Sequence, residues 1–344
     1  MRSMGRLISL GMALLACLAL AASGLAVQAA DLAAQRQLRD SAAARMRNVR
    51  VLSPGTPAPL PVSALLPTPS PAPEPEAEEE ETLHAVWSSE GRKNIRETTI
   101  GGALLLKNET GYEVDAAALL EEGPRVRLPA EGPQILILHT HGSEAYTPAG
   151  LDRYDASDTN RTQDTRYSVI RVGDELASLL EEQGLRVLHD REIYDYPSYT
   201  GSYARSGEAV ERTLAQYPGI SLVIDLHRDA LGADGVVYKT MAEEEGTVAS
   251  QIMLLVGTDE SGLEHPDWRS NLSLALYLQQ AAAALHPTLM RPVDLVPQRY
   301  NQQLTGGSLI LEVGSSGNTL QEALAAIRLF ARAVGPALLA LTES

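Results

Sequence analysis

The sequence is poor in cysteine, in large apolar aromatics and in basic side chains. Cys17 is the one cysteine among 344 residues, which excludes an internal disulfide framework and a cysteine-rich metal site. One phenylalanine and two tryptophans leave the core to be built mainly from aliphatic side chains. The balance of 28 basic against 44 acidic side chains gives a formal net charge of −16. A general nucleic-acid binder is therefore excluded, because such a protein needs a cationic face to neutralise phosphates.

The N-terminal segment is long and uncharged. Residues 7–30 contain no charged side chain and follow two arginines. A helix rises ~1.5 Å per residue and a bilayer core of ~30 Å needs about 20 residues, so this segment is long enough to span a membrane. Residues 1–30 are predicted to be a membrane anchor or signal segment. The alternatives to an uncleaved anchor are cleavage near residues 27–29 and a lipoprotein modification at Cys17. Each places the rest of the chain outside the cytoplasm.

The chain length predicts one large domain with appendages. Residues 31–81 begin with an Ala/Arg-rich helical stretch and continue into a proline-rich run that ends in glutamates. Because proline removes backbone donors and like charges repel, this part is predicted to be a stiff, extended spacer, the alternative being a disordered tail without a role. Residues 82–131 are predicted to be a small N-terminal extension with a short strand at 101–106. Residues 132–344 are then the main domain.

Apolar strand patterns alternate with helical patterns through the main domain. Strands are predicted at residues 134–138, 185–188, 221–226, 248–256 and 308–313, and helices at 168–183, 209–217, 271–285 and 319–341. This alternation predicts an α/β fold, with a mixed, mostly parallel sheet flanked by helices on both faces.

Three of the predicted strands end in polar residues that an apolar core would not choose. The first strand continues into residues 139–144, the second ends in residues 225–229, and the third carries Glu312. In open α/β sheets, ligands bind outside the carboxyl ends of the strands. We therefore expect these three clusters to meet at one rim of the sheet.

These strand ends contain a candidate metal centre. A catalytic zinc ion takes three nitrogen or oxygen ligands and leaves one position for water, and His141, Glu144 and His227 supply such a set. The net charge of +1 lowers the pKa of the bound water to about 7. Glu312 is the expected general base, which later protonates the leaving amine. The alternative interpretation is structural: hydrogen-bonded core histidines, a capping or ion-paired Glu144, and a Glu312 that pairs with an arginine.

Six short motifs between Leu104 and the C-terminus form a specific combination. They are LKNETGY (106–112), ILHTHGSEAY (137–146), VGDEL (172–176), YDYPSYTGSY (194–203), DLHRDA (225–230) and LEVG (311–314). Together they resemble the stage II sporulation protein P family, whose members are membrane-anchored cell-wall hydrolases of engulfment in endospore formation. That family is similar to the zinc-dependent N-acetylmuramoyl-L-alanine amidases, whose fold is a mixed sheet flanked by helices.

The resemblance implies an activity, a cofactor and partners. The activity is hydrolysis of the amide between the lactyl group of muramic acid and L-alanine in peptidoglycan, with cleavage of the peptide cross-links left open. The cofactor is Zn²⁺, and the usual partners are a lytic transglycosylase and another membrane protein. The main domain, residues 132–344, would be the catalytic domain. A zinc endopeptidase that acts only on wall peptides and a non-enzymatic septal scaffold that binds the wall are the alternatives.

The resemblance also assigns roles to residues. It places the first zinc histidine at His141, the second at His227 and the base at Glu312. The carboxylate ligand departs from the pattern, because the related amidases carry it at the start of the following helix, where this chain offers Asp164. Glu144 is favoured and Asp164 is the alternative. From the residues alone, the predicted substrate-binding residues are His139, Tyr199, Arg205 and Arg228. The alternatives are a tyrosine loop that is only rigid and hydrogen-bonded, and an Arg228 that pairs with Asp229.

Overall fold

The computed structural model describes residues 96–100, 104–157, 160–233, 236–244 and 246–343. The predicted anchor or signal segment at 1–30, including Cys17, and the predicted spacer at 31–81 lie outside the described residues. Among the residues that are described, no helix is both long enough and apolar enough to cross a membrane.

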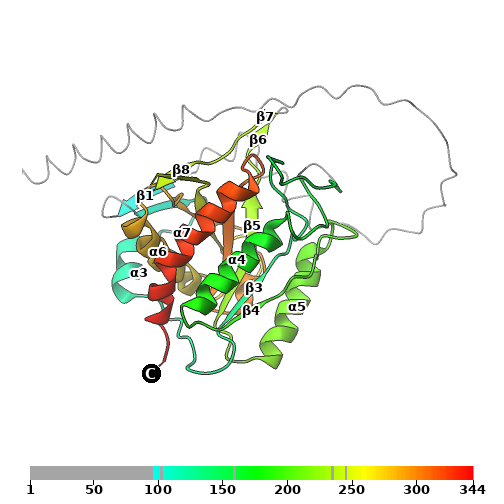
Figure 1. Cartoon of the computed structure of the whole chain (residues 1–344). Helices are drawn as coiled ribbons and strands as arrows, with labels where there is room; N and C mark the ends of the chain where they lie inside the picture. Colours follow the sequence, from blue (N-terminus) through cyan, green and yellow to red (C-terminus); the bar gives the residue numbers. More distant parts are fainter. Residues whose placement is uncertain (1–95, 101–103, 158–159, 234–235, 245, 344) are drawn as a thin grey trace, which may run out of the picture. The chain divides into compact units, whose positions relative to one another are not determined.

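An eight-stranded sheet organises the described part of the chain (Figure 1). In spatial order its strands are β1 (Arg96–Ile100), β2 (Leu104–Asn108), β11 (Val293–Val296), β10 (Ile252–Gly257), β12 (Ser308–Ser315), β5 (Leu222–Asp229), β3 (Ile135–Leu138) and β4 (Val187–His189). The pairs β1–β2 and β10–β12 are antiparallel, and the other neighbouring pairs are parallel. The prediction of a mixed, mostly parallel sheet is confirmed.

Helices cover both faces of this sheet. They are α3 (Ala116–Glu122), α4 (Val169–Glu182), α5 (Ser202–Gln216), α6 (Trp268–Leu285) and α7 (Leu320–Leu339). Figure 1 shows α4 and α7 side by side across one face. Along β3, Ile135 and Ile137 pack into the large core that contains α4, α6 and α7. Leu136 and Leu138 point the other way and pack with Val210 of α5. The predicted two-sided α/β arrangement is therefore present.

The helix boundaries follow from local chemistry. Ser168 caps α4, because its side chain accepts a hydrogen bond from the Ile170 N–H. The chain leaves this helix at Gly184, whose φ of 97° favours glycine. Thr319 and Glu322 form a reciprocal capping box at the start of α7. Both helices match their predicted spans to within two residues, because these caps can be recognised in sequence.

Other elements differ from the sequence prediction. The strand predicted at 248–256 is two strands: β9 (Thr247–Ala249) pairs with β8 (Ala242–Glu244) in a separate hairpin, and β10 lies in the main sheet. Helix α5 begins at Ser202 rather than at 209, directly after the left-handed Gly201. Strand β11, helix α3 and the short elements β6 (Gly232–Ala233), β7 (Val236–Val237) and η2 (Gln302–Leu304) were outside the prediction.

Because β2 pairs with β11, part of segment 82–131 contributes to the main sheet. The division at residue 132 stays a prediction.

A glycine in α4 makes room for two contacting histidines, His139 and His189, between this helix and the sheet. His139 is fully buried, with Nδ1 2.8 Å from the Leu226 carbonyl oxygen and Nε2 2.8 Å from Nε2 of His189. A Cβ atom on Gly173 would lie 2.6 Å from Nε2 of His139 and 2.7 Å from that of His189. Only glycine therefore allows α4 to pack this closely against both rings.

This packing predicts the effect of Gly173→Ala on stability. Alanine gains about 0.8–1.0 kcal/mol of helix propensity, but forcing a methyl group into a packed site costs about 1–3 kcal/mol. We expect a net loss of stability, measured as a lower Tm in thermal unfolding. The matched control is Gly335→Ala in α7, where the added methyl would lie 2.0 Å from Oε1 of Gln183, the end of a flexible side chain that can move aside, unlike the packed ring of His139. An unchanged Tm for Gly173→Ala would contradict the close packing.

Candidate active site at the ends of three parallel strands

The carboxyl ends of β3, β5 and β12 lie next to one another. These strands are parallel neighbours, and the register places Glu312 beside His227 and Leu138 beside Asp225. Leu226 and Leu311 point into the large core. Because side chains alternate along a strand, Asp225, His227 and Glu312 point to the opposite face, the one that α5 partly covers. The three polar clusters therefore do meet at one rim.

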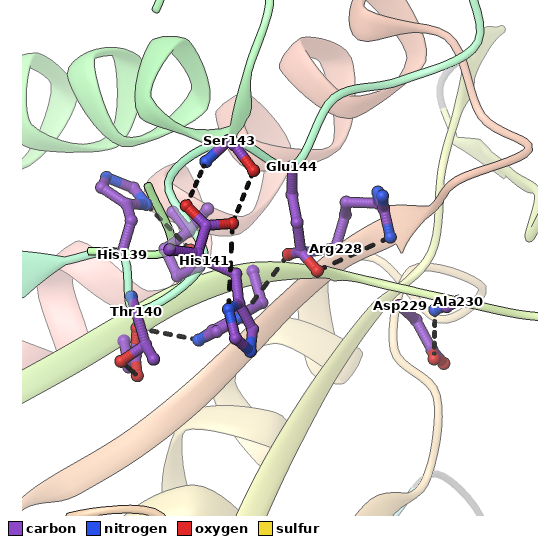
Figure 2. Close-up of polar contacts among 12 residues, drawn as sticks. His139, Thr140, His141, Ser143, Glu144, Arg228, Asp229 and Ala230 are labelled. Atoms are coloured by element: carbon purple, nitrogen blue, oxygen red, sulfur yellow. Dashed lines mark hydrogen bonds and ion pairs between the residues drawn. The ribbon is translucent and has the colours of Figure 1, made fainter. Parts of the chain in front are cut away.

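Glu144 lies on the same turn as His141 and faces the other histidine, His227. It is buried in the turn that follows β3, and its Oε2 atom is 3.5 Å from Nδ1 of His227 and 3.2 Å from the Arg228 N–H nitrogen. Figure 2 shows the Glu144 carboxylate extending toward the Arg228 guanidinium, which lies 3.6 Å from Oε1. Burial alone would raise the pKa of Glu144, but Arg228 and His227 outweigh it and hold that pKa well below its usual range.

His141, the third predicted metal ligand, lies next to His227. Its ring centre is 5.4 Å from that of His227, with the two planes at 82°. The ring is also stacked on Tyr199 at 4.5 Å and meets the edge of Tyr203 at 5.5 Å. Burial lowers the pKa of His141 to about 3, although Glu144 opposes this shift. The imidazole is therefore neutral at pH 7, which is the form that binds metal ions.

Asp225 contacts His227 at its other ring nitrogen, Nε2. Its Oδ1 atom is 2.8 Å from Nε2 of His227, and its two oxygens accept hydrogen bonds from the backbone N–H and the hydroxyl of Thr140. Burial alone would lower the pKa of His227, but the carboxylates of Asp225 and Glu144 raise it well above its ordinary value. The arrangement leaves Nδ1 of His227 facing Glu144, while Nε2 lies at ion-pair distance from Asp225 without a hydrogen bond of good geometry among the described residues.

The Glu312 carboxyl group has a raised pKa and a buried oxygen without a hydrogen-bond partner in the described part of the chain. Its Oε2 atom is buried and has no hydrogen-bond partner among the described residues. Burial, followed by the nearby Asp229 carboxylate, raises the pKa of Glu312 to about 8, and His227 opposes this shift. A carboxyl group poised close to neutral pH is what general acid–base catalysis requires.

Two residues considered in the sequence lie apart from this group. His139 points behind the sheet toward α4, where both ring nitrogens have partners. This position gives it no access to a substrate at the rim. Asp164 holds Arg166, with Oδ1 2.8 Å from Nε and Oδ2 2.6 Å from Nη2. The structure therefore brings Glu144, and not Asp164, next to His227.

The predicted substrate-binding arginines are engaged within the protein. Arg205 donates to the carbonyl oxygens of Tyr194, Ser198 and Thr200, and so fixes the tyrosine-rich loop (residues 194–201) from within. Arg228 is buried, and it donates to two backbone carbonyls at 3.0 Å, those of Ala145 and Asn160. Tyr199 differs from both arginines, because it is 39% exposed and lies over His141.

The sequence analysis missed Arg161 and Asp195. Arg161 Nη1 is 2.6 Å from Oδ2 of Asp195, and the same carboxylate accepts hydrogen bonds from the N–H and hydroxyl of Ser143. Asp195 lies inside the tyrosine-rich motif, which was a usable signal. Arg161 lies in an irregular segment that carries no periodic pattern.

The predicted metal ligands have the chemistry of a metal site but not its full geometry. Among the described residues, no three His, Cys, Asp or Glu side chains surround a common point. Two observations nevertheless match a zinc site. Nδ1 of His141 is buried without a hydrogen-bond partner in this part of the chain. Glu144 Oε2 and His227 Nδ1 are 3.5 Å apart, close to the separation of two ligands ~2.1 Å from a tetrahedral ion. The residues therefore fit the chemistry of a two-histidine, one-carboxylate centre.

Solved structures similar to this one include two amidases. N-acetylmuramoyl-L-alanine amidase AmiC2 of Nostoc punctiforme is 13% identical with a TM-score of 0.36, over 61% of this chain and 98% of that chain. The CwlD amidase from Clostridioides difficile in complex with the GerS lipoprotein is 12% identical with a TM-score of 0.35, over 60% and 98%. At these TM-scores the likeness carries no conclusion about activity.

A sequence relative and a family model give more specific matches than the solved structures do. The curated Stage II sporulation protein P of Bacillus subtilis (strain 168) is 26% identical over 199 residues, which make up 55% of this chain and 47% of the relative. The chain thus matches about half the length of that relative. Residues 69–335 match the family model of Stage II sporulation protein P (SpoIIP), a span that contains all six motifs. The chain therefore belongs to the stage II sporulation protein P family.

Proposed function

We propose that this protein is a zinc-dependent peptidoglycan hydrolase that cleaves the N-acetylmuramoyl-L-alanine amide during engulfment in endospore formation. The observation that carries the proposal is the meeting of His141, Glu144, His227 and Glu312 at one rim of the sheet, the first three buried and Glu312 half-buried. Membership of the family supports the cellular process. The chemistry of the cluster supports hydrolysis rather than wall binding alone, because a binding surface needs no buried acid next to two imidazoles.

His141, Glu144 and His227 would hold the metal ion. When bound, zinc supplies a Lewis acid that polarises the amide carbonyl and lowers the pKa of water to about 7. Asp225 keeps the His227 ring in the orientation that presents Nδ1 to the site. Arg228 holds Glu144 through its backbone N–H and its guanidinium group, so that the carboxylate stays ionised.

Glu312 would move the proton. Its Oε2 atom accepts a proton from the attacking water as the water oxygen bonds to the amide carbon. The same atom then gives that proton to the amide nitrogen, and the C–N bond breaks to release the free amine of L-alanine. The raised pKa of Glu312 lets one group serve both steps near neutral pH.

Tyr199 is the substrate contact that we retain from the sequence analysis. Its exposed ring offers a flat apolar surface to a sugar ring at the entrance of the site. Arg205 and Arg228 support the loop and Glu144 instead, because their donors are taken by carbonyl oxygens. We further propose that residues 1–30 anchor the protein, that residues 31–81 act as spacer outside the cytoplasm, and that a lytic transglycosylase and a second membrane protein are partners.

The first test uses the purified full chain and isolated sacculi. We expect soluble fragments with new N-terminal L-alanine, and we expect a zinc chelator to stop their release and added zinc to restore it. Mass spectrometry of the fragments measures the bond that is cut. Cleavage confined to the cross-links would instead favour the endopeptidase. Intact sacculi together with no bound zinc would favour the wall-binding scaffold.

The second test separates the two candidate carboxylate ligands. Glu144→Gln removes the charge next to His227, and we expect zinc affinity to fall by more than about 100-fold, since even indirect contacts to a metal are worth about 10–100-fold. Asp164→Asn is the control and should bind zinc like the wild type, because Asp164 pairs only with Arg166 in the described structure. Titration against a chromophoric chelator measures both. The reverse pattern would move the ligand to Asp164.

The third test concerns the proton carrier. Glu312→Gln keeps the shape of the side chain but cannot shuttle a proton, so we expect kcat to fall about 10²–10⁴-fold while zinc still binds. The exposed Glu192→Gln variant is the control and should keep full activity. If Glu312→Gln hydrolyses sacculi at the wild-type rate, Glu312 is not the base.

A further inference from the structure

We propose that Arg161 is a positioning residue, which sets the two ligands carried by the turn after β3, His141 and Glu144, relative to His227. The proposal rests on the proposed function and adds to it a residue that neither the motifs nor the resemblance singled out. Arg161 contacts one ligand directly and reaches the other through two residues of the tyrosine-rich loop.

The first contact fixes how the Glu144 carboxylate is turned. Arg161 Nη2 lies 3.5 Å from Oε1 of Glu144, and Arg228 Nη1 lies 3.6 Å from the same oxygen. The other oxygen, Oε2, faces Nδ1 of His227 at 3.5 Å. The two guanidinium groups thus hold one oxygen and leave the other directed at the histidine. If the Glu144 carboxylate could rotate freely, neither of its oxygens would stay directed at His227.

The second contact supports the turn itself. Arg161 Nη1 is 2.6 Å from Oδ2 of Asp195, whose side chain is almost completely buried. Asp195 accepts hydrogen bonds from the Ser143 N–H at 3.1 Å and the Ser143 hydroxyl at 2.5 Å. Ser143 lies between the two ligands in sequence. The Arg161–Asp195 pair therefore holds the middle of the turn, and Oδ2 is also 3.9 Å from Nδ1 of His141.

The third contact reaches His141 through an aromatic ring. The guanidinium carbon of Arg161 lies 5.0 Å from the ring centre of Tyr199, within the range of a cation–π interaction. The Tyr199 ring is in turn stacked on His141, with the planes only 10° apart. Arg161 thereby limits the movement of the ring that packs against the first ligand.

The backbone places Arg161 opposite Glu144. The two residues form an isolated antiparallel bridge. The Ala145 N–H donates to the Asn160 carbonyl at 2.9 Å, and the Thr162 N–H donates to the Ser143 carbonyl at 2.7 Å. Residues 160–162 therefore pair with the turn that carries His141 and Glu144. This pairing fixes the backbone position from which the Arg161 side chain extends.

Only arginine can serve these contacts together. Its planar guanidinium group presents several donors in a fixed fork, so that separate nitrogens reach Glu144 and Asp195 while the guanidinium carbon lies over the Tyr199 ring. A lysine ammonium group carries the same charge at a single point and cannot make the three contacts at once. The substitution Arg161→Lys therefore removes the positioning while keeping a cation beside the buried Asp195.

The test measures zinc affinity, kcat and KM for the full-length Arg161→Lys variant. We expect zinc affinity to fall about 10–100-fold, kcat to fall with it, and KM to stay near the wild-type value. Chelator competition gives the affinity, and thermal unfolding of the metal-free protein shows that the fold is kept. Arg166→Lys is the matched control, because Arg166 also pairs with an aspartate and lies over a tyrosine ring, but outside the site.

A second variant separates positioning from folding. In Arg161→Ala, guanidinium ion at low millimolar concentration should restore part of the zinc affinity, whereas sodium chloride of equal ionic strength should not. Wild-type zinc affinity in Arg161→Lys would overturn the inference. So would a loss in Arg161→Ala that guanidinium does not restore and that matches a lower Tm of the metal-free protein. If the wild-type chain binds no zinc, the proposed function itself fails.

Discussion

Buried charge must be paired, and this requirement governs the structure around the three strand ends. Glu144 is paired with Arg228 and Arg161, Asp195 with Arg161, and Asp225 with His227. Removing one partner would leave an uncompensated charge in the interior, which is costly. Glu312 has no ion pair within the described residues, and burial together with the nearby Asp229 carboxylate raises the pKa of its carboxyl. The least compensated acid is therefore the one to which we assign the proton transfer.

Much of this arrangement could be predicted from sequence, because parallel strands bring their carboxyl ends together. Polar residues at the ends of three apolar runs were enough to predict that His141, His227 and Glu312 would meet. The opposite directions of His139 and His141 could not be predicted in this way. Strand alternation places residues two apart on the same face, but β3 ends at Leu138, and a turn begins at Thr140, between the two histidines. His139 therefore points toward α4 and His141 toward the rim.

The parts that escaped prediction lack a periodic signal. Arg161 is positioned by a two-residue backbone ladder in an irregular segment, and such pairing depends on tertiary contacts. Strand β11 is only four residues long and contains Asp294, so its apolar pattern is too short to recognise. The run at 248–256 looked continuous, because nothing in its composition shows that its first half pairs with β8 and its second half with β12. Strand partners are a property of the fold rather than of the segment.

The stacking of Tyr199 on His141 has a consequence for how quickly the site can be reached. His141, Glu144 and His227 are each no more than 6% exposed, and one face of the His141 ring is covered by the tyrosine. A molecule that is to touch that face must first displace the ring. If the proposed hydrolysis takes place here, displacement of Tyr199 would be a step of substrate entry that is separate from bond breaking.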